Sequence, residues 1–368
     1  MTEQREIRCL GFQAPGEPYV WSYLEDPLPE GSFQVETLYS GFSAGTELTF
    51  LKGTNPYLHA RWDDAIGAFD DAAVGTVYPV PFTGYMEVGV VSVSRAASAE
   101  PGSIVALSYG HKTGHTAHGA ADCFTVLDGE LDPLLGIYVA QMGPICANGL
   151  LHAAAEAKGA EAAGLADGVA GRRVLVQGAG VVGLLIGLWA KRLGAEAVAV
   201  ADATPARLGA VEALGLMPVD DAEGEAWRRL KDEWRSEDGT RGADLAFQCR
   251  GQAAALGSAL RSLRPQGTVI DLAFYQGGAD ELRLGEEFHH NGLSIRCAQI
   301  ARVPRGMEDR WDHRRLAAET VDLLRSDGDL LLEHVITDIV PFEEAPRFVQ
   351  ELGARERHSI QAVFDMRS

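Results

Sequence analysis

Short apolar and β-branched runs fill the first 145 residues of the chain, and clusters of proline and glycine separate them. These runs lie at residues 7–12, 33–42, 89–95, 103–109 and 122–127. Short strands at this spacing, with turn residues between them, are typical of sandwiches and barrels. The pattern therefore predicts a barrel-like β domain at the start of the chain.

The pattern changes after an alanine-rich, helix-favouring segment at residues 149–173. From Arg173 onward, short continuous apolar runs alternate with amphipathic helical patterns. Such alternation is typical of βαβ units on a parallel sheet, because helices cover both faces of the strands. A mixed tail from about Arg302 ends in strand-like residues, which we expect to complete the first domain. We therefore predict an α/β chain with a discontinuous β-barrel domain at residues 1–145 and 301–368, and a doubly wound parallel-sheet domain at residues 146–300.

The composition excludes several classes of protein. The 368 residues suffice for two domains with their own cores, and 52 acidic against 32 basic residues give a formal net charge of −20. A chain this acidic is repelled by phosphate backbones and anionic lipid, so we expect no nucleic-acid and no membrane partner. The five cysteines form no Cys-x-x-Cys pair, which excludes a disulfide framework and a four-cysteine zinc lobe. This cysteine usage, with no apolar leader at the N-terminus, predicts a reducing, cytoplasmic location.

A glycine-rich turn joins the first strand of the parallel-sheet pattern to the helix after it. Gly178, Gly180 and Gly183 form a Gly-x-Gly-x-x-Gly sequence, in which Val181 and Val182 open the helix. The glycines allow a tight turn, the close approach of the backbone to a pyrophosphate, and close packing of helix on strand. The helix N-terminus adds N–H groups and a positive dipole end for the phosphates. The turn predicts a dinucleotide site; the alternative is a packing turn in an unrelated α/β fold.

An acidic residue closes the next predicted strand, where a ribose-binding carboxylate is expected. Asp202 lies 19 positions after Gly183. Its carboxylate would accept hydrogen bonds from the adenosine ribose hydroxyls and repel a 2′-phosphate, so we predict NAD rather than NADP. Arg207, five residues further on, would flank the adenine with its planar guanidinium or lie on a solvated helix face.

Three further motifs give the chain a resemblance to the medium-chain dehydrogenase/reductase superfamily. Residues 39–47 (YSGFSAGTE) resemble its first motif, usually Ser-Gly-Val-Cys-x-Thr-Asp, and residues 84–91 (GYMEVGVV) resemble its Gly-His-Glu-x-x-Gly-Val-Val. Residues 264–270 (RPQGTVI) resemble its strand entry near the nicotinamide. The resemblance runs nearly end to end and implies a GroES-like catalytic domain with a Rossmann NAD-binding domain. It also implies that the cofactor site includes residues at the ends of the later strands: Cys249, Ala273 and Tyr275.

The positions that hold catalytic zinc in alcohol dehydrogenases of this superfamily carry other residues here. The cysteine of the first motif is replaced by Ser43 or Ala44, the histidine of the second by Tyr85, and the adjacent glutamate by Met86. Zinc prefers thiolate, imidazole or carboxylate ligands, so the aligned motifs predict no catalytic metal site. The pattern is similar to a zinc-less branch that includes bacteriochlorophyllide 3-hydroxyethyl dehydrogenase and threonine dehydrogenase-like proteins. That resemblance implies oxidation of a secondary alcohol.

Without zinc, side chains must accept the alcohol proton and stabilise the developing oxyanion. By resemblance, Thr46 takes the place of the hydroxyl that hydrogen-bonds the substrate oxygen. Glu47 matches the aspartate behind the family's metal ligands, and its alternative role is that of a buried ion-pair partner. Tyr85 either hydrogen-bonds the reacting oxygen or fills the space of the missing metal.

A histidine-rich segment follows one of the predicted strands of the β domain. His111, His115 and His118 would share a helix face and form a replacement metal site, although Gly110 and Gly114 disfavour a helix. Alternatively, His111 or His115 is the acid–base group, because an imidazole titrates near neutral pH. In a third interpretation these loop histidines have no chemical role.

We therefore predict an NAD-dependent, zinc-independent oxidoreductase that interconverts a secondary alcohol and its ketone. Sugar- or cyclitol-like compounds are among the secondary alcohols expected as substrates. Its partner would be a small-molecule substrate, and relatives in the superfamily imply a homodimer or homotetramer. The acidic segment at residues 62–71 would contact the substrate, or serve as a solvated lid or dimer loop. Two alternatives stay open: an NADPH-dependent enone or quinone reductase of the same superfamily, and a non-catalytic dinucleotide-binding protein. Asp202 opposes the first, because that branch generally places small or basic residues at this position.

Overall fold

The computed structural model describes residues 4–275 and 277–367, and the chain forms two compact units. Of the described residues, unit 1 comprises 4–141 and 336–367, and unit 2 comprises 142–275 and 277–335. The sequence pattern placed the return to the first domain at about residue 301, whereas the chain returns at Ile336. The difference lies in helix α8 (His313–His334), which packs on helix α2 (Met142–Lys158) and so belongs to unit 2.

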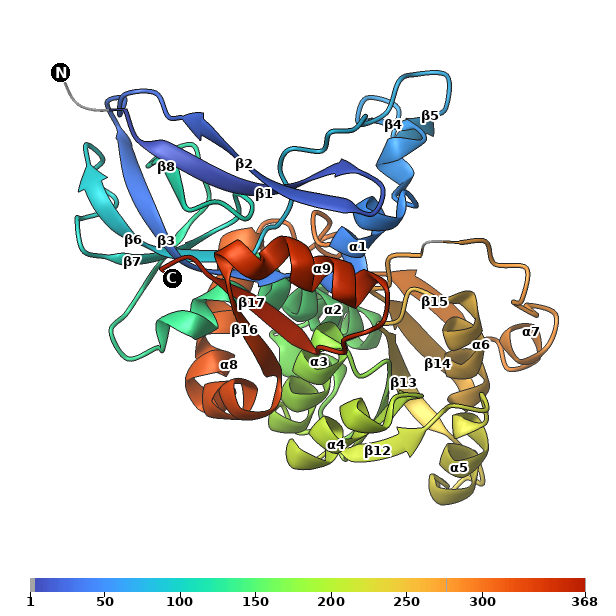
Figure 1. The fold of residues 1–368 in the computed structure, drawn as a ribbon. Helices are drawn as coiled ribbons and strands as arrows, with labels where there is room; N and C mark the ends of the chain where they lie inside the picture. Colours follow the sequence, from blue (N-terminus) through green and yellow to red (C-terminus); the bar gives the residue numbers. More distant parts are fainter. Residues whose placement is uncertain (1–3, 276, 368) are drawn as a thin grey trace. The chain divides into compact units, whose positions relative to one another are not determined.

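Unit 1 consists mainly of β-strands (Figure 1). Its elements are β1 (Glu6–Ala14), β2 (Glu17–Leu24), β3 (Ser32–Phe42), α1 (Ala44–Lys52), β4 (Arg61–Asp63), β5 (Ala68–Asp70), β6 (Glu87–Ser94), β7 (Ile104–Leu107), β8 (Gly114–His118), β9 (Thr125–Leu127), β16 (Ile336–Pro341), α9 (Ala345–Gly353) and β17 (Gln361–Asp365). The main sheet has the order β16-β17-β3-β6-β7-β9, with β8 also paired to β3, and β1 pairs with β2. Strand β17 is antiparallel to β3, so the end of the chain completes the first unit.

One hydrophobic core of unit 1 holds β3 in place next to helix α1. Helix α9 buries Ala345, Phe348, Val349 and Leu352, the spacing of one helix face. These side chains pack with buried aromatic residues such as Phe364 of β17. Burial of each large apolar side chain contributes about 1.5–3 kcal/mol, so this core fixes the strand end from which α1 begins.

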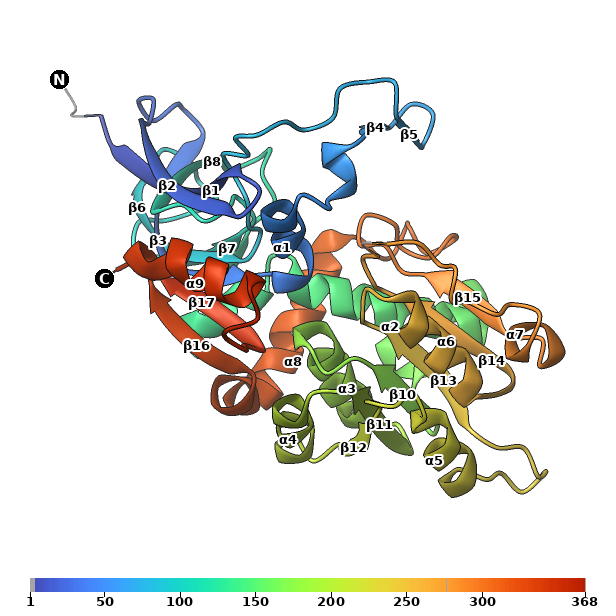
Figure 2. The same cartoon turned by 45° about the vertical axis from the view of Figure 1, so that its right-hand side comes forward.

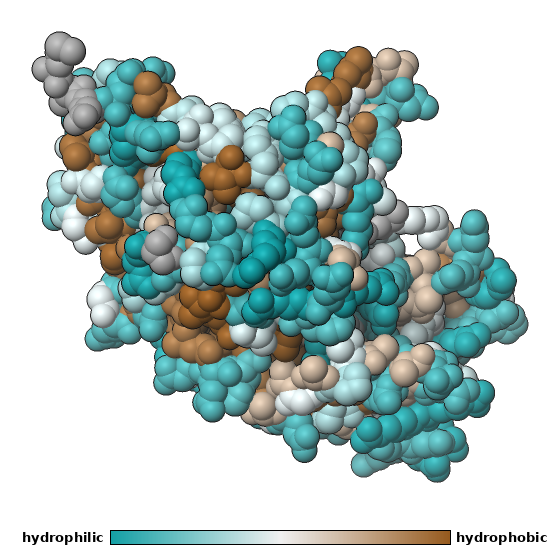
Figure 3. All heavy atoms as spheres, viewed as in Figure 1, coloured by the Kyte–Doolittle hydropathy of each residue, from teal (hydrophilic) through white to brown (hydrophobic). Residues whose placement is uncertain are grey.

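An arm that carries β4 and β5 extends from unit 1 in both ribbon views (Figures 1 and 2). It forms a short hairpin over most of the predicted acidic segment, with Trp62 paired to Phe69 in register. Three of its apolar side chains are exposed: Ile66 at 70%, Phe69 at 45% and Val74 at 80%. Brown hydrophobic residues are accordingly seen on the arm in Figure 3.

Unit 2 is the doubly wound parallel sheet that the pattern predicts. Besides α2 and α8, its elements are β10 (Arg173–Gln177), α3 (Val181–Arg192), β11 (Ala197–Asp202), α4 (Pro205–Ala213), β12 (Met217–Asp220), α5 (Ala226–Glu233), β13 (Ala243–Gln248), α6 (Ala253–Ser262), β14 (Leu263–Asp271), α7 (Glu287–His290) and β15 (Ser294–Cys297). The strand order is β12-β11-β10-β13-β14-β15, and all neighbours are parallel. The carboxyl ends of these strands therefore share one edge, where ligands bind in such sheets. Within residues 4–275 and 277–367, no helix combines the length and apolar character needed to cross a membrane.

Candidate active site

Strand β10 ends in a turn whose geometry requires glycine at two positions. Gly178 has φ +106°, which L side chains rarely adopt. A Cβ on Gly183 would lie 1.8 Å from the Gly178 carbonyl oxygen, so only glycine lets α3 approach the strand this closely. A Cβ on Gly180 would meet nothing within 4 Å, which leaves space beside the helix N-terminus. Val181 and Val182 form the first turn of α3, so their backbone N–H groups lie at the helix N-terminus beside this space. The turn and the helix N-terminus therefore fit the phosphates of a dinucleotide.

Asp202 lies at the carboxyl end of β11 and is 3% exposed. Its Oδ2 accepts a hydrogen bond from the backbone N–H of Ala179 at 2.9 Å, and its Oδ1 accepts one from Thr204 at 2.8 Å. The Nη1 atom of Arg207 is 3.8 Å from the same carboxylate. Asp202 thus ties the glycine-rich turn to the end of β11, a structural role that the spacing alone did not indicate.

The other predicted cofactor residues lie at the ends of β13 and β14. Burial raises the pKa of the Cys249 thiol, which makes it a poor nucleophile. The Ala273 N–H and the Tyr275 hydroxyl donate hydrogen bonds to Asp271 at 2.9 Å and 2.8 Å. Asp271 is absent from the predicted set, although it carries the same signal as Asp202, a carboxylate that closes an apolar strand.

A cavity of about 470 Å³ opens at this edge of the sheet in unit 2. Its lining includes residues that follow β11, β12 and β13 and residues of helix α6, among them Ala203, Asp221, Arg250, Gln252 and Arg261. Ala203 directly follows Asp202, so the cavity adjoins the expected ribose position. Its volume is within the usual range for ligand pockets.

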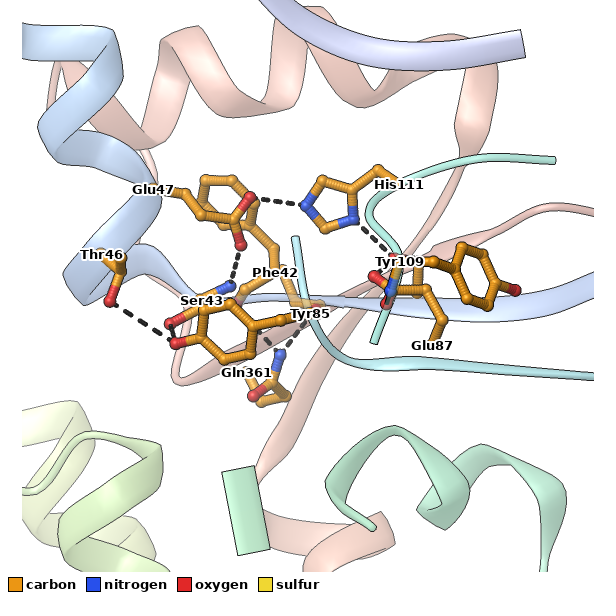
Figure 4. A network of polar contacts seen from close by, with 11 residues as sticks. Phe42, Ser43, Thr46, Glu47, Tyr85, Glu87, Tyr109, His111 and Gln361 are labelled. Carbon is orange, nitrogen blue, oxygen red and sulfur yellow. Dashed lines mark hydrogen bonds and ion pairs between the residues drawn. The ribbon is translucent and has the colours of Figure 1, made fainter. Parts of the chain in front are cut away.

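Three hydroxyl groups meet at the N-terminus of helix α1 in unit 1 (Figure 4). The Tyr85 Oη lies 2.5 Å from the Ser43 Oγ and 3.5 Å from the Thr46 Oγ1. We call Ser43, Thr46 and Tyr85 the hydroxyl cluster. Ser43 precedes α1 but does not cap it with its side chain, and Glu47 instead accepts the Ser43 backbone N–H at 2.7 Å. Tyr85 and Thr46 are partly exposed, so the cluster can hydrogen-bond a further oxygen.

His111 lies behind the hydroxyl cluster and is 1% exposed. Its Nε2 is 2.7 Å from the Glu47 Oε2 (Figure 4). Its Nδ1 is 2.6 Å from the Ser40 Oγ. Burial alone would lower the pKa of His111, but the charge and hydrogen bond of Glu47 and the charge of Glu87 outweigh it and raise that pKa. The structure thus brings His111 and Glu47 together, with Glu47 between the imidazole and the hydroxyl cluster.

The other two histidines of the segment lie in a strand and not in a helix. Strand β8 pairs with β3 over both residues, so the helix that a three-histidine metal site requires is not formed. His115 stacks on Tyr109 with ring centroids 4.5 Å apart, and burial lowers its pKa to about 4. His118 accepts hydrogen bonds at Nδ1 from the backbone N–H groups of Ala120 and Ala121. The structure does not place His115 with Tyr85 or Thr46.

The residues at the family's zinc positions do not fit that metal. Ser43 and Tyr85 offer hydroxyl groups that bind each other, and Met86 is fully buried. Among the residues that the structure describes, no three histidine, cysteine, aspartate or glutamate side chains are grouped to hold a metal ion. A catalytic zinc needs three such ligands and an open position.

Comparison with known proteins identifies related sequences. Residues 181–311 match the family described as zinc-binding dehydrogenase. Over 193 residues the chain is 30% identical to D-guloside 3-dehydrogenase of Escherichia coli (strain K12). The matched region covers 51% of this chain and 53% of that protein. The chain thus spans about half the length of the curated relatives it matches.

Solved structures share the whole architecture. An alcohol dehydrogenase from Thermus sp. ATN1 has a TM-score of 0.73 at 20% identity, over 97% of this chain and 99% of that one. A zinc-binding-type dehydrogenase from Sinorhizobium meliloti 1021, solved with NADP, has a TM-score of 0.70 at 18% identity. The match covers 98% of this chain and 100% of that one. At this identity the likeness concerns the fold, and it confirms the predicted combination of a GroES-like domain and a Rossmann domain.

Proposed function

The chain belongs to the medium-chain dehydrogenase/reductase superfamily, and on this premise we propose that it is an NAD-dependent secondary-alcohol dehydrogenase that works without catalytic zinc. The observation that carries the proposal is the hydroxyl cluster, because Ser43 and Tyr85 lie at motif positions where zinc-dependent relatives hold the metal, and Thr46 lies beside them. Their hydroxyl groups are unsuited to zinc but suited to binding an alcohol oxygen and exchanging its proton.

Oxidation of a secondary alcohol removes a proton from its oxygen and a hydride from its carbon. A bound nicotinamide supplies the hydride acceptor, so the side chains must deal only with the proton. Thr46 holds the alcohol oxygen by a hydrogen bond, and the Tyr85 phenolate accepts the alcohol proton. The Ser43 hydroxyl donates to the Tyr85 Oη and stabilises its negative charge. In the reverse direction, the Tyr85 hydroxyl returns the proton to the ketone oxygen.

The carboxylate of Asp202 supports NAD as the cofactor. Its negative charge at the end of β11 opposes the 2′-phosphate of NADP. Arg207 is 3.8 Å from this carboxylate and partly exposed, so it partners Asp202 rather than forming an open phosphate site. The NADP found in one structural neighbour makes a direct comparison of the two cofactors necessary.

A sugar-like secondary alcohol is the proposed substrate class. The support is the relative named D-guloside 3-dehydrogenase, which matches half of the chain. The homodimeric or homotetrameric assembly, the cytoplasmic location, and the absence of nucleic-acid and membrane partners stay predictions from the sequence.

The test is turnover of the full chain with NAD or NADP and a panel of glycosides, cyclitols and simple secondary alcohols. Enones and quinones with NADPH form the second arm. We expect a sugar-like alcohol to be oxidised with a kcat/KM at least about tenfold higher for NAD. A tenfold preference for NADP, or reduction of enones alone, would overturn the proposal. Tight NADH binding without turnover of any compound would indicate a non-catalytic protein.

A further inference from the structure

Four buried polar side chains form one connected group next to the hydroxyl cluster; Figure 4 labels three of them, Glu47, Glu87 and His111. We call Ser40, Glu47, Glu87 and His111 the buried histidine network; each is at most 2% exposed. The Ser40 Oγ lies 2.6 Å from the His111 Nδ1 and 3.0 Å from the Glu87 Oε1, and the His111 Nε2 lies 2.7 Å from Glu47. Strands β3 and β6, helix α1 and the loop after β7 each supply one member.

The Ser40 hydroxyl carries one hydrogen, which restricts the protonation of the network. When Ser40 donates to Glu87, the His111 Nδ1 must donate to Ser40, and the Nε2 donates to Glu47. His111 is then an imidazolium. When Glu87 carries the proton, Ser40 donates to Nδ1 and His111 is neutral. Burial raises the pKa of the Glu87 carboxyl, against the charge of His111 and the Tyr109 backbone N–H, which donates to Glu87 at 2.9 Å. In both states the His111 Nε2 donates to Glu47, and the charge of Glu47 favours the imidazolium.

The charged groups that act on His111 come from two elements. Glu47 on α1 and Glu87 on β6 both raise the pKa of His111 and outweigh its burial. The rings of Phe42 on β3 and Phe364 on β17 pack beside the imidazole, with centroids 5.9 Å and 5.0 Å away. An imidazolium enclosed in this way is held by two carboxylates and shielded by apolar rings.

Glu47 connects this charge to the hydroxyl cluster. One of its oxygens faces the His111 Nε2, and the other accepts the Ser43 backbone N–H at 2.7 Å. Without a cationic partner, a carboxylate that is 2% exposed must take up a proton or turn toward solvent. Either change weakens the hydrogen bond that fixes the Ser43 backbone, and the Ser43 Oγ then leaves the Tyr85 hydroxyl.

We propose that His111 and Glu47 are positioning residues, whose ion pair holds Ser43 so that its hydroxyl keeps the Tyr85 phenol aimed at the reacting oxygen. The inference rests on the proposed function of Tyr85 as the group that exchanges the proton. His111 itself is too buried to touch a substrate, so it acts through Glu47.

Nitrogen NMR of the full chain labelled with ¹⁵N-histidine tests the ion pair without any substrate. His111→Gln identifies the His111 signals. We expect both ring nitrogens to be protonated at neutral pH, and Glu47→Gln to lower the titration midpoint of His111 by about one pH unit or more. A singly protonated ring at neutral pH, or an unchanged midpoint in Glu47→Gln, overturns the ion pair.

A double-mutant cycle tests the positioning role. We expect His111→Gln and Glu47→Gln each to lower kcat about 10- to 100-fold, and to cause little further loss in a Tyr85→Phe background. His118→Gln is the matched control on the same segment and should keep the wild-type kcat. Glu47→Gln has the same shape as the native residue, so it completes the cycle if His111→Gln fails to fold.

The outcomes separate the two proposals. A loss of equal size in the wild-type and Tyr85→Phe backgrounds refutes the positioning role alone. A wild-type kcat in Tyr85→Phe itself refutes the proposed function of Tyr85, and the positioning role with it.

Discussion

Replacement of Asp202 with alanine removes a carboxylate that is 3% exposed and accepts hydrogen bonds from the Ala179 and Thr204 backbones. A hydrogen bond to a charged group contributes about 1.5–3 kcal/mol, and about 1.4 kcal/mol is a tenfold change in Kd. Loss of the ribose contact should therefore weaken NADH binding about 10- to 150-fold. NADPH should bind equally well or better, because the charge that opposes its 2′-phosphate is gone.

The same substitution leaves two backbone N–H groups without their acceptor. An unsatisfied buried group costs about 1–3 kcal/mol, and in a domain of this size each kcal/mol lowers Tm by about 2–4 °C. We therefore expect a moderate fall in Tm, and binding must be measured well below it.

Isothermal titration with NADH and NADPH is the assay, and Asp220→Ala is the matched control. Asp220 is the register partner of Asp202 on β12 but is exposed. It accepts only a local N–H, from Ala222 at 2.9 Å. Its removal should leave both Kd values unchanged. Unchanged Kd values for both cofactors in folded Asp202→Ala would refute the role of Asp202, as would an equal effect of Asp220→Ala.

Three other substitutions and a pH series test the rest of the site. Tyr85→Phe should lower kcat about 10²- to 10⁴-fold in steady-state assays, with the Kd of NADH unchanged; an unchanged kcat would contradict the proton role. Gly183→Ala should lower Tm, because its Cβ would lie 1.8 Å from a carbonyl oxygen. Gly180→Ala should keep the wild-type Tm and weaken dinucleotide binding, because its Cβ would meet no protein atom within 4 Å. Equal Tm values for the two variants would argue against this packing of α3 on β10. Because the pKa of His111 is raised in the folded chain, its contribution to stability should be complete below about pH 6.5 and be lost as the pH rises through the raised value. Unfolding of the wild type against His111→Gln across this range should show the difference shrink with rising pH, and a constant difference would contradict the raised pKa.

The parallel sheet and its glycine-rich turn could be predicted because their signals are local. Residues 174–176 and 197–201 are continuous apolar runs, and both form the buried centres of strands in the sheet. The glycines between them have a fixed spacing that reflects the geometry of one turn. The mixed tail of the pattern contains a helical stretch at residues 313–326, the first part of helix α8. The membership of α8 in unit 2 depends on packing against α2, which no local pattern contains.

The arrangement behind Tyr85 could not be predicted, because its contacts join distant parts of the chain. His111 and Glu47 are 64 residues apart, and Ser40 and Glu87 are 47 apart. The pairing of β3 with β6 and β17, and backbone hydrogen bonds that join His111 to Leu10 and Thr83, bring them together. The three histidines at residues 111–118 have the spacing of one helix face, although Gly110 and Gly114 disfavour a helix. Pairing of residues 114–118 with β3 determines a strand.

Metal analysis of the purified, active full chain, combined with kcat before and after treatment with a strong chelator, tests the zinc-independent mechanism most directly. We predict well under one zinc per chain and an unchanged kcat for oxidation of the secondary alcohol. One zinc per chain, whose removal abolishes turnover and whose return restores it, would contradict the account.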